Sequence, residues 1–196
     1  MTVLPVLETE RLRIRPFVSD DLAHVHKLFQ DIGWLDPRLT DDEQWAHNGR
    51  YVAWNTLNHQ ALADLYQPPT GDRVIERRET GEFVGLCGVV GIWGPFGVLP
   101  ALGGQADGFS WPEVGLFWAV SPAQQGSGYA SEAARALIEA LFARFNLQRI
   151  LAVTETENHA SRRVMEKVGM RIEVNPFPEP PWLQVVGIIY HPKGQP

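Results

Sequence analysis

Apolar and polar positions along the chain follow two different spacings, which predict strands and helices. Residues 11–15 alternate arginine with an apolar residue, as a half-buried strand does. Residues 130–145 instead repeat apolar side chains at steps of three and four, the spacing of one face of an amphipathic helix. The same helical spacing occurs at residues 20–29 and 158–168, and we expect Gly169 to end the second of these helices.

Turn residues and apolar runs predict the remaining elements. Ser19 is placed to cap the helix that starts at residue 20, and a further helix is expected at residues 42–63. Residues 74–78 and 83–92 are expected to form a hairpin. Further strands are expected at residues 114–120, 150–153 and 185–190.

Two stretches in the middle of the chain have unusual compositions. Residues 114–120 are nearly all apolar, which predicts a strand buried on both faces. Residues 93–112 hold five glycines and three prolines among aromatic side chains, which predicts a long loop. The order of strands and helices implies a mixed α/β sheet, and the length fits a single domain spanning residues 1–196.

The composition excludes several classes of protein. Hydrophobic residues make up 44% of the chain, which is enough for a core, and the scattered Lys and Arg residues in a chain of net charge −6 predict no nucleic-acid binding. No apolar run approaches the ~18 residues of a membrane helix, and Met1–Glu10 does not resemble a signal peptide, so a cytoplasmic location is expected. The histidines show no metal-ligand spacing, and no metal is expected. The single cysteine, Cys87, lies in an apolar run and is predicted to be a buried thiol.

A glycine loop, Gln125–Ala130, separates the apolar strand from the long helix. The first N–H groups of a helix lack internal partners and the helix dipole adds positive potential, so such a turn can bind an anion. Gly126 and Gly128 can take positive φ and leave no Cβ in the way of a phosphate. The loop lacks the Gly-Lys-Ser/Thr of a P-loop and the three glycines of a dinucleotide fingerprint. The alternative is an ordinary helix entry with two incidental glycines.

Three segments carry a resemblance to one family. Residues 122–133, Pro-Ala-Gln-Gln-Gly-Ser-Gly-Tyr-Ala-Ser-Glu-Ala, resemble the pyrophosphate loop of the GNAT acetyltransferases, Gln/Arg-x-x-Gly-x-Gly/Ala, with Gln125, Gly128 and Ala130 in the three defined places. Residues 155–170 resemble the later part of the same cofactor site, and residues 9–15 resemble the opening of the RimJ/RimL ribosomal-protein acetyltransferase branch.

The resemblance implies a GNAT fold, in which flanking helices cover a mixed central sheet that contains a splayed parallel strand pair. It also implies acetyl-CoA as the acyl donor and a reaction in which an amine attacks the thioester directly. The main-chain N–H of Val120 would bond the thioester oxygen as negative charge develops there. Asn158 matches a position that bonds the pantetheine or phosphate region, although capping its own helix is an alternative role. The implied cofactor-binding residues are Val120, Gln125, Gly126, Ser127, Gly128, Tyr129, Ala130 and Asn158.

Acid–base catalysis has one candidate base and no obvious acid. Glu113, at the start of the apolar strand, is the candidate general base, and a solvated strand-end carboxylate is the alternative. Glu132 would repel a pyrophosphate and is predicted to have a structural role in the first helical turn. Met165 stands where many relatives carry a tyrosine that protonates the leaving thiolate, so that acid is absent and Ser161 is a remote substitute.

The identity of the acceptor stays open at this stage. A protein N-terminal α-amine and a small-molecule amine both fit the resemblance, and the protein is expected to act as a monomer or a homodimer. A coenzyme A-binding sensor without catalytic activity is the alternative function, which the missing tyrosine supports.

Overall fold

The computed structural model describes residues 3–194. Contacts within the chain gather in two compact units, Met1–Gly88 with Phe117–Leu137 (unit 1) and Val89–Leu116 with Ile138–Pro196 (unit 2). Three elements run through both units: strand β4 (Phe83–Gly94), strand β5 (Trp111–Val120) and helix α3 (Tyr129–Phe145). The strands follow the order β1-β2-β3-β4-β5-β6-β8-β7 in one mixed sheet, which confirms the predicted α/β class.

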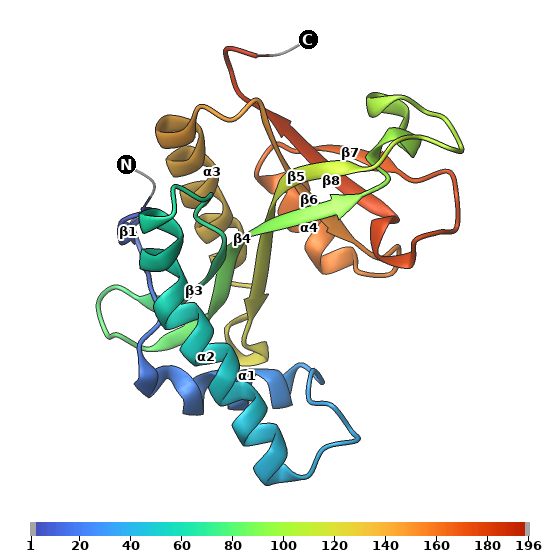
Figure 1. Ribbon diagram of the computed structural model, residues 1–196. Coiled ribbons are helices and arrows are strands. Elements are labelled where there is room, and N and C mark those ends of the chain that lie inside the picture. Colours follow the sequence, from blue (N-terminus) through green and yellow to red (C-terminus); the bar gives the residue numbers. More distant parts are fainter. Residues whose placement is uncertain (1–2, 195–196) are drawn as a thin grey trace. The chain divides into compact units, whose positions relative to one another are not determined.

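Unit 1 contains three neighbouring antiparallel strands, β1 (Leu7–Glu8), β2 (Leu12–Arg15) and β3 (Gly71–Arg77) (Figure 1). The alternation predicted for residues 11–15 is confirmed, because Leu12 and Ile14 are fully buried while Arg13 is exposed. Helices α1 (Leu22–Asp31) and α2 (Asp41–Asp64) lie between β2 and β3 along the chain, and Thr40 caps α2 by accepting from the N–H of Glu43. The core of this unit consists of Phe17, Val25, Leu28, Phe29, Val52, Val74, Leu86 and Ala119.

Unit 2 contains an antiparallel group of strands in the order β6 (Arg149–Thr154), β8 (Val185–Tyr190) and β7 (Arg171–Val174). Helix α4 (His159–Lys167) packs against these three strands (Figure 1). Strand β5 joins β6 in parallel through the pair Gly115 and Leu151. The core of this unit consists of Phe96, Val98, Leu99, Leu151, Leu183, Val186 and Ile188.

Short 3₁₀ turns complete the elements. Unit 1 holds η1 (Ser19–Asp21) and η4 (Pro122–Gln124), and unit 2 holds η2 (Phe96–Val98), η3 (Pro100–Leu102) and η5 (Pro181–Leu183). Among the helices that the structure describes, none combines the length and the apolar character needed to cross a membrane.

One local prediction is wrong, and two are right only in part. Ser19 does not cap α1, since it begins η1 and the N–H of Val18 instead bonds the carboxylate of Asp21. The long loop predicted at residues 93–112 is present between β4 and β5, but it carries η2 and η3, and its Phe96, Val98 and Leu99 enter the core of unit 2. The strand predicted at residues 114–120 is longer, and only Gly115, Leu116 and Ala119 within it are buried.

Cys87 is completely buried in β4, as predicted. Burial raises the pKa of its thiol to about 12, which outweighs the opposite effect of the Arg73 guanidinium. The thiolate, which is the reactive form, is therefore about one part in ten thousand at pH 8.

We expect Cys87 to resist thiol-specific reagents in the folded protein and to react stoichiometrically in denaturant. The measurement is the absorbance released by a disulfide reagent at pH 8, with and without urea. Rapid labelling of the folded protein would contradict the burial of this thiol.

Candidate functional site

The glycine loop occupies the end of β5 in unit 1. After Val120 the chain makes the 3₁₀ turn η4, and the side chain of Gln125 closes the turn by donating from Nε2 to the Val120 carbonyl at 3.1 Å. Gly126 and Gly128 have φ of 77° and 83°, in the left-handed region that favours glycine. A Cβ on Gly126 would meet nothing within 4 Å, so backbone conformation and not crowding calls for glycine there.

The loop presents a row of hydrogen-bond donors. Helix α3 begins at Tyr129. The first backbone hydrogen bond at this end of the helix runs from the Glu132 N–H to the Gly128 carbonyl at 3.0 Å. Within residues 3–194 we find no acceptor for the N–H groups of residues 126–130. Gln125–Ser127 are exposed, so these donors lie at the surface beside the positive end of the helix dipole. This arrangement suits an anion with several oxygens, such as a diphosphate.

The end of β5 lies directly against β4 in unit 1. A Cβ on Gly85 would come within 2.2 Å of the Ala119 carbonyl oxygen and 2.9 Å of the Val120 Cα. The N–H of Ser121 also donates to the Val84 carbonyl at 2.9 Å. Only glycine permits this approach of two backbones, which fixes the strand end from which the loop starts.

Residues in the N-terminal part of unit 1 donate hydrogen bonds to Glu132, which lies in the first turn of α3. Its Oε1 accepts from the Thr9 hydroxyl at 2.5 Å and from the Arg11 N–H at 3.0 Å, and its Oε2 accepts from Arg11 Nε at 2.7 Å. Partial burial acts to raise the pKa of Glu132, but these hydrogen bonds outweigh it and the pKa lies below its ordinary value. The structural role predicted for Glu132 is confirmed.

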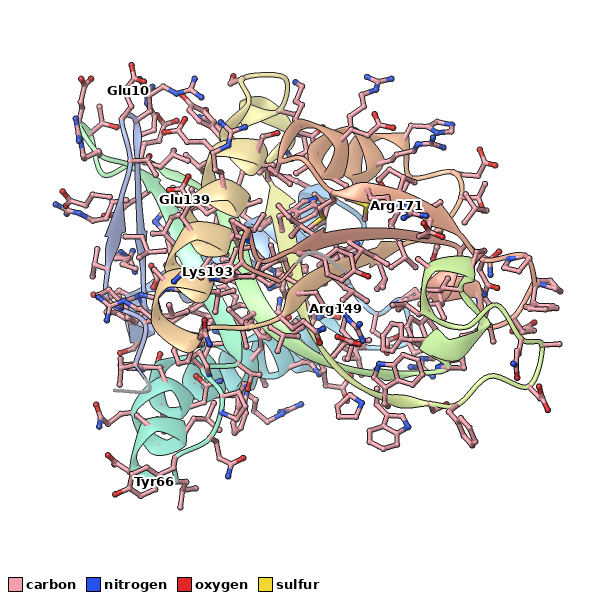
Figure 2. All side chains as sticks on the ribbon, turned by 90° about the horizontal axis from the view of Figure 1, so that it is seen from above. Glu10, Tyr66, Glu139, Arg149, Arg171 and Lys193 are labelled. Atoms are coloured by element: carbon pink, nitrogen blue, oxygen red, sulfur yellow. The ribbon has the colours of Figure 1, made fainter. Side chains whose placement is uncertain are left out.

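Glu113 belongs to a buried ion pair in unit 2. Its Oε1 accepts from Trp111 Nε1 and from Nε and Nη2 of Arg149, the Nε at 3.0 Å. Arg149 is labelled in Figure 2 and lies at the start of β6. The side chain of Glu113 is 8% exposed, so the alternative of a solvated strand-end carboxylate is wrong. The hydrogen bond to Glu113 raises the pKa of Arg149 above its ordinary value.

The N-cap of α4 and the position of Met165 within the helix differ in exposure. Asn158 is exposed, and its Oδ1 accepts from the Ser161 N–H at 3.0 Å, so the predicted capping role is confirmed. Met165 is fully buried, and a Cβ on Gly187 would lie 3.1 Å from its Cβ and Cγ. A buried thioether donates no proton, so this position supplies no acid.

The structure divides the predicted site residues between the two units. Val120 and the loop Gln125–Ala130 lie together in unit 1, whereas Glu113 and Asn158 belong to unit 2. No group of three His, Cys, Asp or Glu side chains among the described residues could hold a metal ion. The sequence does not reveal that Arg11 pairs with Glu132 and Arg149 with Glu113. Each arginine lies at the edge of a predicted strand, and no sequence periodicity links it to its glutamate.

Comparison with known protein families gives a match over most of the chain. Residues 11–171 match the family described as "Acetyltransferase (GNAT) domain". The chain is 51% identical over 61 residues to the uncharacterized N-acetyltransferase YnaD of Bacillus subtilis (strain 168), a stretch that covers 31% of this chain and 35% of that protein. It is 30% identical over 168 residues to the uncharacterized protein YkkB of the same strain, covering 84% of each.

Solved structures share the fold at lower identity. An acetyltransferase from Agrobacterium tumefaciens str. C58 is 24% identical with a TM-score of 0.63, over 97% of this chain and 96% of that chain. RimL, a ribosomal L7/L12 alpha-N-protein acetyltransferase in complex with coenzyme A, is 16% identical with a TM-score of 0.63, over 94% and 97%. A chimera of spermidine N-acetyltransferase SpeG from Vibrio cholerae with hSSAT is 19% identical with a TM-score of 0.56, over 93% and 96%.

The buried ion pair predicts the effect of removing Arg149. Arg149→Gln leaves the Glu113 carboxylate without its charged partner, and we expect a loss of about 2 to 3 kcal/mol in the free energy of unfolding. This is at the low end for a buried pair because the Arg149 side chain is 20% exposed. Arg162→Gln, which breaks an exposed pair with Glu166, should cost about 0.5 kcal/mol or less. Equal losses in urea unfolding would show that burial of the first pair has no energetic consequence.

Proposed function

The chain belongs to the GNAT acetyltransferase family, and on that premise we propose that it transfers an acetyl group from acetyl-CoA to a primary amine. Members of this family generally use acetyl-CoA as donor, so the chain is an acyltransferase and the predicted family and fold are confirmed. The acceptor in this proposal is a protein N-terminal α-amine or a small-molecule amine. With acetyl-CoA as the donor, the expected place of action is the cytoplasm.

The observation that carries the proposal is the set of N–H groups at residues 126–130, at the start of α3, for which the described part of the chain offers no acceptor. A diphosphate offers the oxygens that such donors require, and the left-handed glycines Gly126 and Gly128 let it approach the backbone closely. The exposed loop would therefore hold the pyrophosphate of coenzyme A, with Gln125, Ser127, Tyr129 and Ala130 completing the turn. Asn158 stays a candidate for the same cofactor on the ground of the sequence.

The chemistry follows from the amine and the thioester. The neutral amine attacks the thioester carbon, the N–H of Val120 bonds the carbonyl oxygen as it gains charge, and coenzyme A leaves as thiolate. A simple thiol has a pKa of about 8.5, so its thiolate leaves without a protein acid and water can protonate it. Met165 is therefore no obstacle to turnover. Glu113 is kept as the candidate general base, acting directly or through a water.

The experiment that tests the proposal measures free thiol released from acetyl-CoA in the presence of a panel of acceptors. The panel should contain peptides with free N-termini, their N-acetylated controls, polyamines and aminoglycosides. We expect release with at least one free amine and none with the acetylated control. Binding of acetyl-CoA without release on any acceptor would favour the sensor, and failure to bind acetyl-CoA would overturn both functions.

Gly128→Asp tests the loop. It adds a side chain and a negative charge to the loop, with the new Cβ 3.6 Å from Arg11 Nη2, and we expect the dissociation constant for acetyl-CoA, measured by calorimetry, to rise at least about tenfold. Gly81→Asp is the matched control, because Gly81 also has positive φ and an added Cβ there would meet nothing within 4 Å. The control should lose similar stability and keep its affinity. Unchanged affinity in Gly128→Asp would place the pyrophosphate elsewhere.

Glu113→Gln tests the base. We expect turnover near neutral pH to fall about 100-fold, the usual contribution of a general base, while the affinity for acetyl-CoA stays the same. Turnover should recover in part as the pH rises, because a larger fraction of the acceptor amine is then neutral without help. If the variant turns over as fast as the native enzyme at every pH, Glu113 does not act as a base, and its role is the ion pair with Arg149.

A further inference from the structure

The side chain of Arg11 bonds to the glycine loop and to the first turn of α3. Its Nε and Nη2 bond Glu132 Oε2 at 2.7 and 2.6 Å, and its Nη1 donates to the Ser127 carbonyl at 3.0 Å. Its guanidinium carbon lies 4.7 Å from the centre of the Tyr129 ring. One side chain that precedes β2 thus contacts three residues on or beside the loop, all within unit 1.

The bond to Ser127 determines which way the loop donors face. A peptide unit is planar and trans, so its carbonyl and the following N–H point in opposite directions. Because Arg11 holds the Ser127 carbonyl on its own side, the N–H of Gly128 is turned away from Arg11. The loop backbone is thereby prevented from rotating a carbonyl toward the bound anion, where it would repel phosphate oxygens.

The bond to Glu132 removes an electrostatic conflict. A carboxylate in the first turn of a helix is favoured by the dipole, but it would repel a diphosphate bound at the same helix end. Arg11 neutralises Glu132 at contact distance, and the Thr9 hydroxyl takes its other oxygen. The helix start keeps its acidic residue without presenting a free negative charge to the ligand.

We propose that Arg11 is a positioning residue for the donor's pyrophosphate, which it serves by orienting the loop backbone through Ser127 and by neutralising Glu132. This inference rests on the proposed function, because it assumes that the loop binds a diphosphate. The planar fork of arginine suits these partners, since Arg11 reaches the carboxylate and the Ser127 carbonyl from different nitrogens, whereas lysine would have to offer all its donors from one nitrogen.

The test compares two ligands that differ in the pyrophosphate. Dissociation constants are measured for acetyl-CoA by calorimetry and for pantetheine, which carries the thiol arm and no phosphate, by NMR titration. In Arg11→Gln we expect the constant for acetyl-CoA to rise about tenfold or more, as removal of a charged hydrogen bond predicts, and that for pantetheine to change less than about twofold. Arg11→Lys should recover only part of the loss.

Arg13→Gln is the matched control. Arg13 is an exposed arginine on β2, the strand that Arg11 precedes; within residues 3–194 it pairs with Glu8 and Glu76 and not with the loop, and its variant should bind both ligands like the native protein. Equal weakening of both ligands in Arg11→Gln would reduce Arg11 to a general structural role, and unchanged acetyl-CoA affinity would overturn the inference. If the native protein binds no acetyl-CoA, the proposed function fails and this inference fails with it.

Discussion

The first N–H groups of α3 have no partner inside the helix, and the local structure around them is arranged so that these donors stay available. Their direction depends on a loop with two left-handed glycines, whose start is fixed by the backbone contact between Gly85 and the end of β5. The direction of the donors therefore depends on the strand, the turn and the helix together. If any of them changed, the donors would no longer be held in the direction that the proposed anion site requires.

Glu113 of β5 and Glu132 of α3 are each paired with an arginine, but the two pairs differ in burial and in their consequences. Glu132 lies near the surface, where Arg11 and Thr9 hold it and its neighbours remain accessible to a ligand. Glu113 lies in a more buried setting, where Arg149 and Trp111 both donate to one oxygen. The exposed pair contributes less to stability and more to the charge seen by a ligand, whereas the buried pair chiefly determines how a strand start is held.

The elements that the sequence predicts well are those whose signal is local. The long helix, the short helix capped by Asn158 and the strand before it were predicted within one or two residues, because an apolar stripe, a cap and a terminal glycine are all present in one segment. The positive φ at Gly126 and Gly128 belongs to the same class.

The features that were missed depend on distant contacts. The pair formed by Arg11 and Glu132 joins residues 121 positions apart, and no periodicity encodes it. Phe96, Val98 and Leu99 become buried only because strands far along the chain provide a surface for them, so their Gly- and Pro-rich segment resembles a loop in isolation. The two-residue strand β1 is too short for any pattern and exists through its pairing with β2.

The ionisation of the acceptor limits what such an enzyme can acetylate. A protein α-amine with a pKa of about 7.7 to 8.0 is roughly 10% neutral at pH 7, whereas a lysine-like amine with a pKa of about 10.4 is neutral to about one part in 2,500. The difference is more than 200-fold in nucleophile concentration, or about 3 kcal/mol. An enzyme must supply this energy when its acceptor is strongly basic. In the proposed reaction this demand would fall on Glu113, whose carboxylate is shared with Arg149.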